Sequence, residues 1–199
     1  MAPPRKHDTD RILDAARAIV LEHGPRAASV TSIARRSGAP TGTLYHRFGS
    51  RDRILSAAWL RALERFQSSA LRAAEQADPV EAGVAMAASV LAFAHERRDD
   101  ARLLLSLRPE DLLDADPGSD LRERIRAINA PLQAELRRVA RALHGRSDAR
   151  ALDAVTRAIV DLPYAAVRRH AAEERMPTWL QRDVVDETRA LLGRPRGTR

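Results

Sequence analysis

The side chains with the clearest chemical capacity lie in one short run, Thr41-Gly42-Thr43-Leu44-Tyr45-His46. On a helical wheel of about 100° per residue, Gly42 and His46 lie opposite Leu44, and Thr43 and Tyr45 flank it. One side of such a helix is apolar, and the other is uncharged but rich in hydrogen-bonding groups. Small polar side chains on an exposed helix can hydrogen-bond to the edges of bases in a DNA groove. The run is therefore a candidate recognition surface.

Patterns that would bind a metal or catalyse a reaction are missing from the sequence. The six histidines are His7, His23, His46, His95, His144 and His170, and no two have the spacing of metal ligands. His170 with Glu173 and Glu174 could share a helix face, but two or three ligands leave the coordination incomplete. The chain has no cysteine, which excludes disulfides, thiolate nucleophiles and cysteine-bound metals. It also has no Gly-x-Ser-x-Gly and no phosphate-binding glycine loop. We expect no enzyme, no metal and no cofactor.

Composition predicts an all-α fold. Of the 199 residues, 44% are hydrophobic, only 4% are aromatic and 31% are charged, and no alternating run of β-branched residues is present. This length suits one or two domains. No stretch approaches the roughly 18 apolar residues of a membrane helix, and no apolar signal region follows the basic start. Together with the absence of cysteine, this favours a cytoplasmic protein without a membrane partner.

Three short helices are expected to position the candidate surface. The first begins with Thr9 or Asp10 as its cap and ends before Gly24. The second is capped by Ser29 and stops at Gly38, and Pro40 occupies the first position of the third. Two helices joined by a tight glycine-containing turn are typical of a helix-turn-helix, although an ordinary three-helix bundle has the same pattern.

Charge distribution favours the nucleic-acid interpretation over the plain bundle. Residues 1–60 carry ten Lys and Arg against five acids, so +5 of the net charge of +7 lies in the first third. The arginines nearest the predicted turn are Arg35, Arg36, Arg47, Arg51 and Arg53. A concentration of positive charge of this kind indicates contact with a polyanion.

The same region resembles the DNA-binding domain of the TetR family of bacterial transcriptional regulators. The resemblance rests on the segments Arg11–Ala16, Gly24, Ser29–Ala34, Gly38 and Gly42–Leu55. It implies an all-α protein with an N-terminal helix-turn-helix domain over residues 1–55 and an effector-binding and dimerisation domain over residues 56–192. The composition of residues 193–199 predicts a disordered tail.

The resemblance implies a set of DNA-contacting residues. These are Thr31, Thr41, Gly42, Thr43, Tyr45, His46, Ser50 and Arg51. Ser50 and Arg51 would bind a phosphate at the start of a helix, or Ser50 would simply cap that helix. The family usually has Ser-Lys where this chain has Pro40-Thr41, so one positive charge is missing. Arg5 and Lys6 could compensate from a basic arm in the minor groove, or they could form a solvated tail.

The rest of the chain is expected to form a helical body that begins with one long helix from Arg51 to about Gln76. The resemblance places an effector pocket there, with candidate residues Trp59, Phe66, Met86, Val90, Phe93, Leu104, Ile128, Leu132 and Tyr164. Any one of these could equally be a core residue. The last helices have apolar faces that a second copy would bury, with candidate interface residues Leu162, Ala166, Leu180, Val184, Thr188 and Leu191. A thicker monomer core is the alternative.

These patterns predict a ligand-responsive DNA-binding regulator. We expect a repressor that binds a pseudo-palindromic operator in double-stranded DNA as a homodimer and is released by a small, mostly apolar effector. The alternative is a helical small-molecule-binding or enzymatic protein whose helix-turn-helix no longer reads DNA. The missing lysine is the only feature that supports this alternative.

Overall fold

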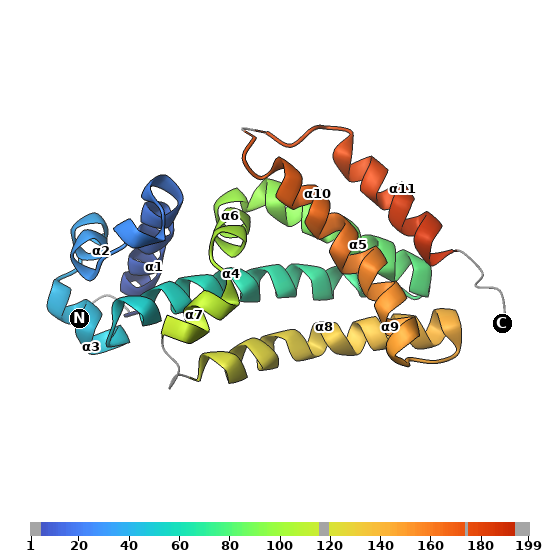
Figure 1. Cartoon of the computed structure of the whole chain (residues 1–199), viewed down its shortest axis with the longest axis horizontal. Helices are drawn as coiled ribbons and strands as arrows, with labels where there is room; N and C mark the ends of the chain where they lie inside the picture. The colour runs from blue at the N-terminus through green and yellow to red at the C-terminus, as the bar shows by residue number, and fades with distance from the viewer. Residues whose placement is uncertain (1–4, 116–119, 174, 194–199) are drawn as a thin grey trace. The chain divides into compact units, whose positions relative to one another are not determined.

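The computed structural model describes residues 5–115, 120–173 and 175–193 (Figure 1). These residues form helices and connecting turns without a strand, as the composition predicted. The helices are α1 (Arg5–His23), η1 (Pro25–Ala27), α2 (Val30–Ser37), α3 (Thr41–Phe48), α4 (Arg51–Ala73), α5 (Pro79–Glu96), α6 (Arg98–Ser106), α7 (Pro109–Ala115), α8 (Leu121–His144), α9 (Ala149–Thr156), η2 (Arg157–Asp161), α10 (Leu162–His170) and α11 (Leu180–Leu192). None of the helices in these residues is long and apolar enough to span a bilayer.

The chain forms two compact units. The first, here called the head, comprises the residues up to Glu64 together with Arg98–Arg126. The second, the body, comprises Arg65–Arg97 and the residues from Ala127 onward. Helices α4 and α8 each contribute to both units. The domain boundary expected after residue 55 falls inside α4 and stays a prediction, and residues 194–199 of the expected tail lie outside the described part of the chain.

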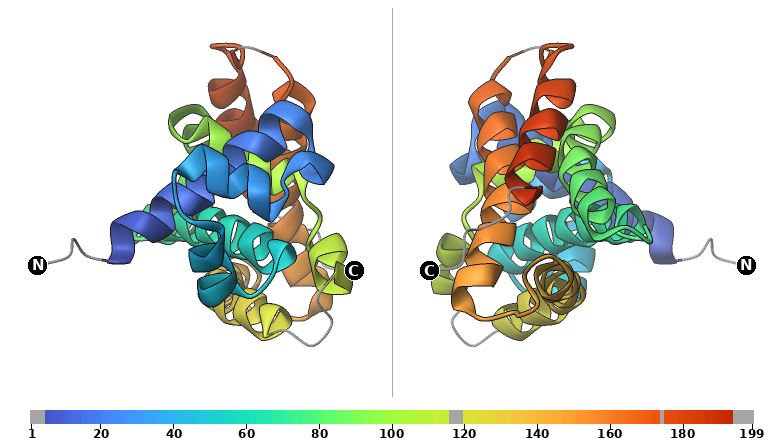
Figure 2. Two further views of the ribbon diagram at one scale, coloured as in Figure 1. Left: turned by 90° about the vertical axis from the view of Figure 1, so that its left-hand side faces the viewer. Right: turned by 90° about the vertical axis from the view of Figure 1, so that its right-hand side faces the viewer.

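In the head, α1 buries its apolar stripe and packs against α2, which in turn packs against α3. Figure 2 (left) shows these three helices from the side that faces left in Figure 1. The expected start of α1 at Thr9 or Asp10 is wrong, because the helix begins at Arg5. No glycine or proline interrupts residues 5–23, so the helix can extend back almost to Pro4. Arg5 and Lys6 therefore lie in the first turn of α1 and not in an arm ahead of it.

The turn between α2 and α3 depends on Gly38, which takes a φ of 71°. This left-handed conformation favours glycine, and it ends α2 sharply enough for α3 to begin three residues later. Pro40 is the N-cap of α3 and not its first helical residue, which corrects the expected start by one position. The arrangement of α2 and α3 is that of a helix-turn-helix.

Two prolines within the later helices have different consequences. A proline inside a helix usually bends or interrupts it, yet α8 continues from Leu121 to His144 with an exposed Pro131 inside it. Its ring costs one backbone hydrogen bond while the buried face of α8 stays packed. Before Pro163 the helix widens into the π-turn η2, in which Leu162 N–H donates to Arg157 O. A π-turn accommodates the missing proline N–H without ending the helix.

The body is held by one apolar cluster to which α4, α5, α8, α9, η2 and α11 contribute. Its members are Ala70, Ala74, Val84, Met86, Leu132, Leu136, Val139, Ala140, Ala151, Val155, Ala158, Ile159 and Leu192. Gly83 of α5 allows a close approach, because a Cβ there would lie 2.5 Å from Leu192 Cδ1 and 3.0 Å from Ile159 Cδ1. This tight packing fixes α11 against α5.

Candidate nucleic-acid interface

Helix α3 presents the polar face that its sequence predicted. Leu44 is only 1% exposed, and Tyr45 is 54% exposed. Thr41, Gly42 and His46 are exposed, and Thr43 is half-buried. Pro40 makes no side-chain cap bond, so this N-cap residue leaves the first N–H groups of α3 without a side-chain acceptor. The exposed face is therefore uncharged, with hydroxyl and imidazole groups around a turn whose backbone N–H groups can approach an anion.

Helix α2 packs against α3, and two serines form hydrogen bonds at its N-terminus. Ser29 Oγ accepts a hydrogen bond of 3.0 Å from Ser32 N–H, and Ser32 Oγ donates to Ala27 O at 2.8 Å. Ile33 is fully buried, whereas Thr31 is exposed. The capped helix thus holds Thr31 on its outer side, close in sequence to the turn that carries α3.

Ser50 caps α4. Its Oγ accepts a hydrogen bond of 3.2 Å from Arg53 N–H, which satisfies one of the free donors in the first turn. Ser50 is half-buried. This hydrogen bond supports the interpretation of Ser50 as a helix cap. A phosphate contact of Ser50 stays a prediction.

Arg51 is engaged inside the head. Its Nε donates to Ala28 O at 2.9 Å, its Nη2 donates to Pro25 O at 2.5 Å, and its Nη1 pairs with Asp52. The guanidinium therefore ties the start of α4 to the carbonyl groups of η1 and its C-cap. A phosphate contact stays a prediction for Arg51, and the geometry adds a positioning role that no sequence pattern indicated.

Other arginines of the head also connect helices. Arg47 donates to Thr9 Oγ1 at 2.8 Å, and Arg11 donates to Ser37 O at 3.0 Å. Arg36 forms a two-pronged contact with Glu22, with both N–O distances at 2.5 Å. The hydrogen bond from Arg36 lowers the pKa of Glu22 below its ordinary value and raises the pKa of Arg36. Much of the positive charge that predicted a polyanion partner therefore also holds the helices together.

The candidate effector residues divide between the two units. Trp59 and Leu104 belong to the head, and the other seven belong to the body. Met86, Phe93 and Leu132 are buried, Phe66, Val90 and Ile128 are half-buried, and Tyr164 is 47% exposed. Phe66 and Phe93 meet edge to face with ring centroids 5.4 Å apart. The role of these nine residues in binding an effector stays a prediction.

A polar pair inside the body was not predicted from the sequence. Gln67 is 5% exposed, and its Nε2 donates to Asn129 Oδ1 at 2.7 Å. The other end of the Gln67 amide contacts no polar group among the described residues. The only sequence signal was a polar residue within the apolar stripe of Leu63, Ala70 and Ala74. A buried amide with one free end is suited to a hydrogen bond with a bound molecule.

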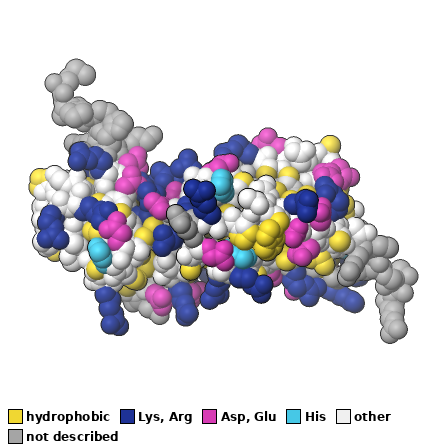
Figure 3. Space-filling model, turned by 90° about the horizontal axis from the view of Figure 1, so that it is seen from above, with side chains coloured by type: hydrophobic (Ala, Val, Ile, Leu, Met, Phe, Trp, Pro, Cys, Tyr) yellow, Lys and Arg dark blue, Asp and Glu magenta, His cyan; other side chains and the backbone are white. Residues whose placement is uncertain are grey.

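The candidate dimer residues lie on α10 and α11. Leu162, Ala166, Leu180 and Val184 line an open groove of about 270 Å³ between these helices. Thr188 is fully buried and donates to Ala158 O at 3.2 Å, so its side chain faces the core of its own chain. Leu191 is 44% exposed. Figure 3 shows hydrophobic side chains gathered on this face and bordered by charged ones.

No group of three or more potential metal ligands occurs among the residues that the structure describes. His170 Nδ1 lies 2.7 Å from Glu173 Oε1, and its ring meets Trp179 edge to face. Glu174, the third member of the weak metal candidate, lies outside the described residues.

Comparison with known proteins identifies the helix-turn-helix. Residues 12–58 match the model of the family described as bacterial regulatory proteins, tetR family. The HTH-type transcriptional regulator UidR of Escherichia coli (strain K12) is 32% identical over 110 residues, which cover 51% of this chain and 50% of that protein. The chain thus matches about half the length of the curated relatives.

Solved structures extend the likeness over the whole fold. The TetR family regulator PfmR from Thermus thermophilus is 25% identical with a TM-score of 0.62, over 92% of this chain and 97% of that one. The fatty acid degradation regulator FadR from Bacillus halodurans has a TM-score of 0.69 at 19% identity, over 94% and 99% of the two chains. Residues 12–58 thus form a DNA-binding domain of the TetR family, and the fold of the chain is similar to that of a TetR family regulator over 92% of its length.

Proposed function

We propose that the chain is a ligand-responsive repressor that binds a pseudo-palindromic DNA operator as a homodimer and acts in the cytoplasm. The observation that carries this proposal is the outer face of α3, where Tyr45 is 54% exposed beside exposed hydroxyl and imidazole groups. Leu44 on the opposite side is buried. A helix of this kind fits the major groove.

The proposed DNA contacts follow from exposure and position. Thr31, Thr41, Gly42, Thr43, Tyr45 and His46 lie on the outer side of α2 and α3, where they can approach base edges and phosphates. Ser50 and Arg51 support them at the start of α4, with Arg51 holding the head in shape through the carbonyl groups of Pro25 and Ala28. Because the reading face is uncharged, affinity depends on phosphate contacts around it.

A second copy is the proposed occupant of the face formed by α10 and α11. Three large apolar side chains are exposed there or beside it: Tyr164 at 47%, Trp179 at 52% and Leu191 at 44%. The groove between the two helices includes Leu162, Ala166, Leu180 and Val184 from the predicted interface. A four-helix arrangement of two copies would bury this surface. Two heads about 34–36 Å apart would then read successive major grooves.

The proposed effector is small, is mostly apolar and has at least one hydrogen-bonding group. The apolar candidates Phe66, Met86, Phe93 and Leu132 supply the contact area. Gln67 supplies a polar anchor, since one end of its buried amide has no partner among the described residues. Effector binding would release the operator by favouring a head arrangement that does not fit it.

Gel-shift titration tests this proposal. The purified chain is titrated onto a labelled fragment from upstream of its own gene and onto a coding fragment of equal length, at several salt concentrations. We expect retardation of the upstream fragment first, and weakening of both complexes as salt rises. Absence of retardation at low salt, or equal affinity for both fragments, would contradict the proposal.

A further inference from the structure

We propose that Asp100 of α6 is a positioning residue for DNA binding, which acts through its ion pair with Arg17 of α1. The inference rests on the proposed DNA-binding function and concerns how α3 is held in orientation within the head. Helix α6 is distant in sequence from the helix-turn-helix, yet it belongs to the head and packs against α1.

The ion pair is buried. Arg17 Nη1 contacts Asp100 Oδ1, and the exposed fractions of the two side chains are 18% and 3%. Placing a carboxylate in such an environment is costly unless a cation faces it, and Arg17 offsets this cost for Asp100. The next acid back along the chain, Asp99, is exposed on the same helix. Of these two neighbouring carboxylates, the structure buries the one that points to α1.

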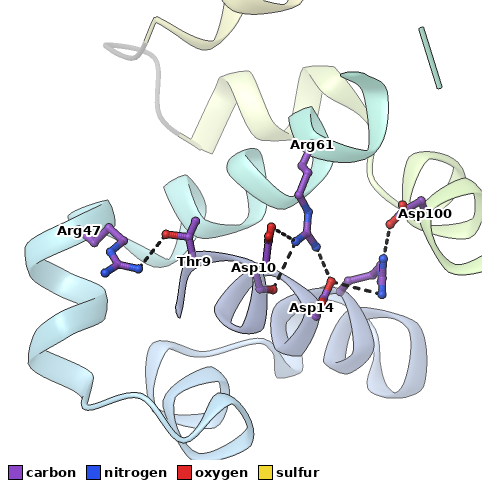
Figure 4. A network of polar contacts seen from close by, with 7 residues as sticks. Thr9, Asp10, Asp14, Arg47, Arg61 and Asp100 are labelled. Atoms are coloured by element: carbon purple, nitrogen blue, oxygen red, sulfur yellow. Dashed lines mark hydrogen bonds and ion pairs between the residues drawn. The ribbon is translucent and has the colours of Figure 1, made fainter. Parts of the chain in front are cut away.

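The pair is one end of a polar network along α1 (Figure 4). Arg17 Nη2 lies 3.4 Å from Asp14 Oδ1, which in turn accepts from Arg61 Nη2 of α4 at 2.6 Å. Arg61 Nη1 also lies 2.9 Å from Asp10 Oδ1. This chain of contacts from Asp10 to Asp100 joins α1 to both α4 and α6.

The other end of the network reaches the recognition helix. Thr9, next to Asp10, accepts a hydrogen bond of 2.8 Å from Arg47 in the last turn of α3. Asp10, Asp14 and Arg17 recur at intervals of four and three positions, which places them along one side of α1 with Thr9 next to Asp10 in its first turns. Helix α1 therefore makes directional contacts with α3, α4 and α6. Because α1 contacts both α3 and α6, the orientation of α3 depends on the position of α6.

Chain continuity makes α6 a suitable place for this contact. Only Arg97 separates α6 from α5, and α5 belongs to the body. The connection between α5 and α6 is therefore a single residue, which limits how far the adjoining ends of these helices can separate.

The test compares Asp100→Asn with the matched exposed control Asp99→Asn. Binding to a fluorescent duplex from upstream of the gene is measured by anisotropy at several salt concentrations. Each variant removes one negative charge, which by itself strengthens attraction to DNA. We expect Asp99→Asn to bind as tightly as the wild type or slightly more tightly, and Asp100→Asn to bind between about 2-fold and 30-fold more weakly. The salt slope stays unchanged, because a positioning residue neutralises no phosphate.

A double variant separates positioning from folding. Arg17→Met with Asp100→Leu replaces the buried pair by apolar side chains of similar size, which can preserve stability. We expect it to keep the helical circular dichroism and melting temperature of the wild type and still to bind DNA more weakly. Wild-type affinity in the folded double variant, or an equal loss in Asp99→Asn, would overturn the inference. Failure of the wild type itself to bind the duplex would instead count against the proposed function.

Discussion

The head is stabilised internally by a different kind of interaction from the body. In the head, arginines reach from helix to helix: Arg11 to Ser37 O, Arg47 to Thr9, Arg51 to Ala28 O and Arg61 to Asp10 and Asp14. In the body, the apolar cluster around Leu136 and Val139, both fully buried, joins most helices. Polar contacts between helices also occur there, as in the pairing of Arg189 with Glu81.

This difference matches the tasks proposed for the two units. Hydrogen bonds and ion pairs are directional, so they fix the orientation of short helices such as α2 and α3, which have little apolar surface of their own. Apolar packing is less directional and tolerates changes of shape when volume is preserved. A surface that recognises DNA requires helices of fixed orientation. An interior that accepts a small molecule benefits from packing that tolerates changes of shape.

Truncation of a core leucine has the largest expected effect and tests the apolar basis of the body. Leu136→Ala removes a fully buried side chain of α8, so we expect the free energy of unfolding to fall by about 2–5 kcal/mol. Urea denaturation followed by circular dichroism measures this loss. Arg137→Ala, at an exposed neighbouring position, serves as the control and should change stability little. Equal effects of the two variants would remove the contrast.

Loss of an exposed aromatic side chain tests the reading surface of the head. Tyr45→Ala should leave stability and helical content unchanged, because the side chain is 54% exposed, and should weaken binding to the upstream duplex by about 5-fold to 150-fold. Anisotropy titration measures the change. Tyr45→Phe distinguishes the contacts: a loss as large as that of Tyr45→Ala assigns the role to the hydroxyl, and full retention assigns it to the ring. Unaltered binding by Tyr45→Ala would exclude Tyr45 from the interface.

Replacement of Arg51 distinguishes arginines that stabilise the head from arginines that bind DNA. Arg51→Ala leaves the carbonyl groups of Pro25 and Ala28 without a donor, so we expect a stability loss of about 1–2 kcal/mol. DNA affinity should fall, and an unchanged salt slope would assign Arg51 the positioning role alone. A slope lower by about one unit would confirm the predicted phosphate contact of Arg51, and unaltered affinity would contradict both roles.

The smallest expected effect concerns the exposed pair of Glu22 and Arg36. The hydrogen bond from Arg36 lowers the pKa of Glu22, so the pair stabilises the head above the unfolded pKa of a glutamate and loses this contribution as pH falls. Glu22→Gln should lower the melting temperature slightly at about pH 7, and the two proteins should converge in acid. Glu81→Gln breaks the ion pair with Arg189 and serves as the matching variant in the body, whose melting temperature is compared with that of Glu22→Gln. A difference that persists in acid would contradict this cause.

Sequence patterns predicted the all-α fold and the position of the helix-turn-helix because both depend on local signals. Apolar spacing, the Ser29 cap and Gly38 specify α2 and its end. The start of α1 was misplaced because residues 5–8 contain neither a clear cap nor apolar spacing. The continuity of α8 through Pro131 does not follow from the sequence, because a proline usually bends or interrupts a helix and only tertiary packing outweighs the lost hydrogen bond.

The candidate site was predicted less completely than the fold. Exposure of Tyr45 and burial of Leu44 follow from helical periodicity. The carbonyl contacts of Arg51, the pairing of Arg17 with Asp100 and the contact between Gln67 and Asn129 join residues 23 to 83 positions apart. Such partners depend on tertiary packing, and no local pattern indicates them. The DNA-contacting, effector and dimer residues themselves stay predictions.

Footprinting of the upstream DNA tests the central claim, that α3 on a rigid head reads a specific operator, most directly. Hydroxyl-radical footprinting with the wild type should show two protected patches whose centres lie about one helical turn of DNA apart, and Tyr45→Ala should lose both at the same protein concentration. Uniform protection of the whole fragment, or none at concentrations that saturate the duplex, would contradict sequence-specific reading by α3.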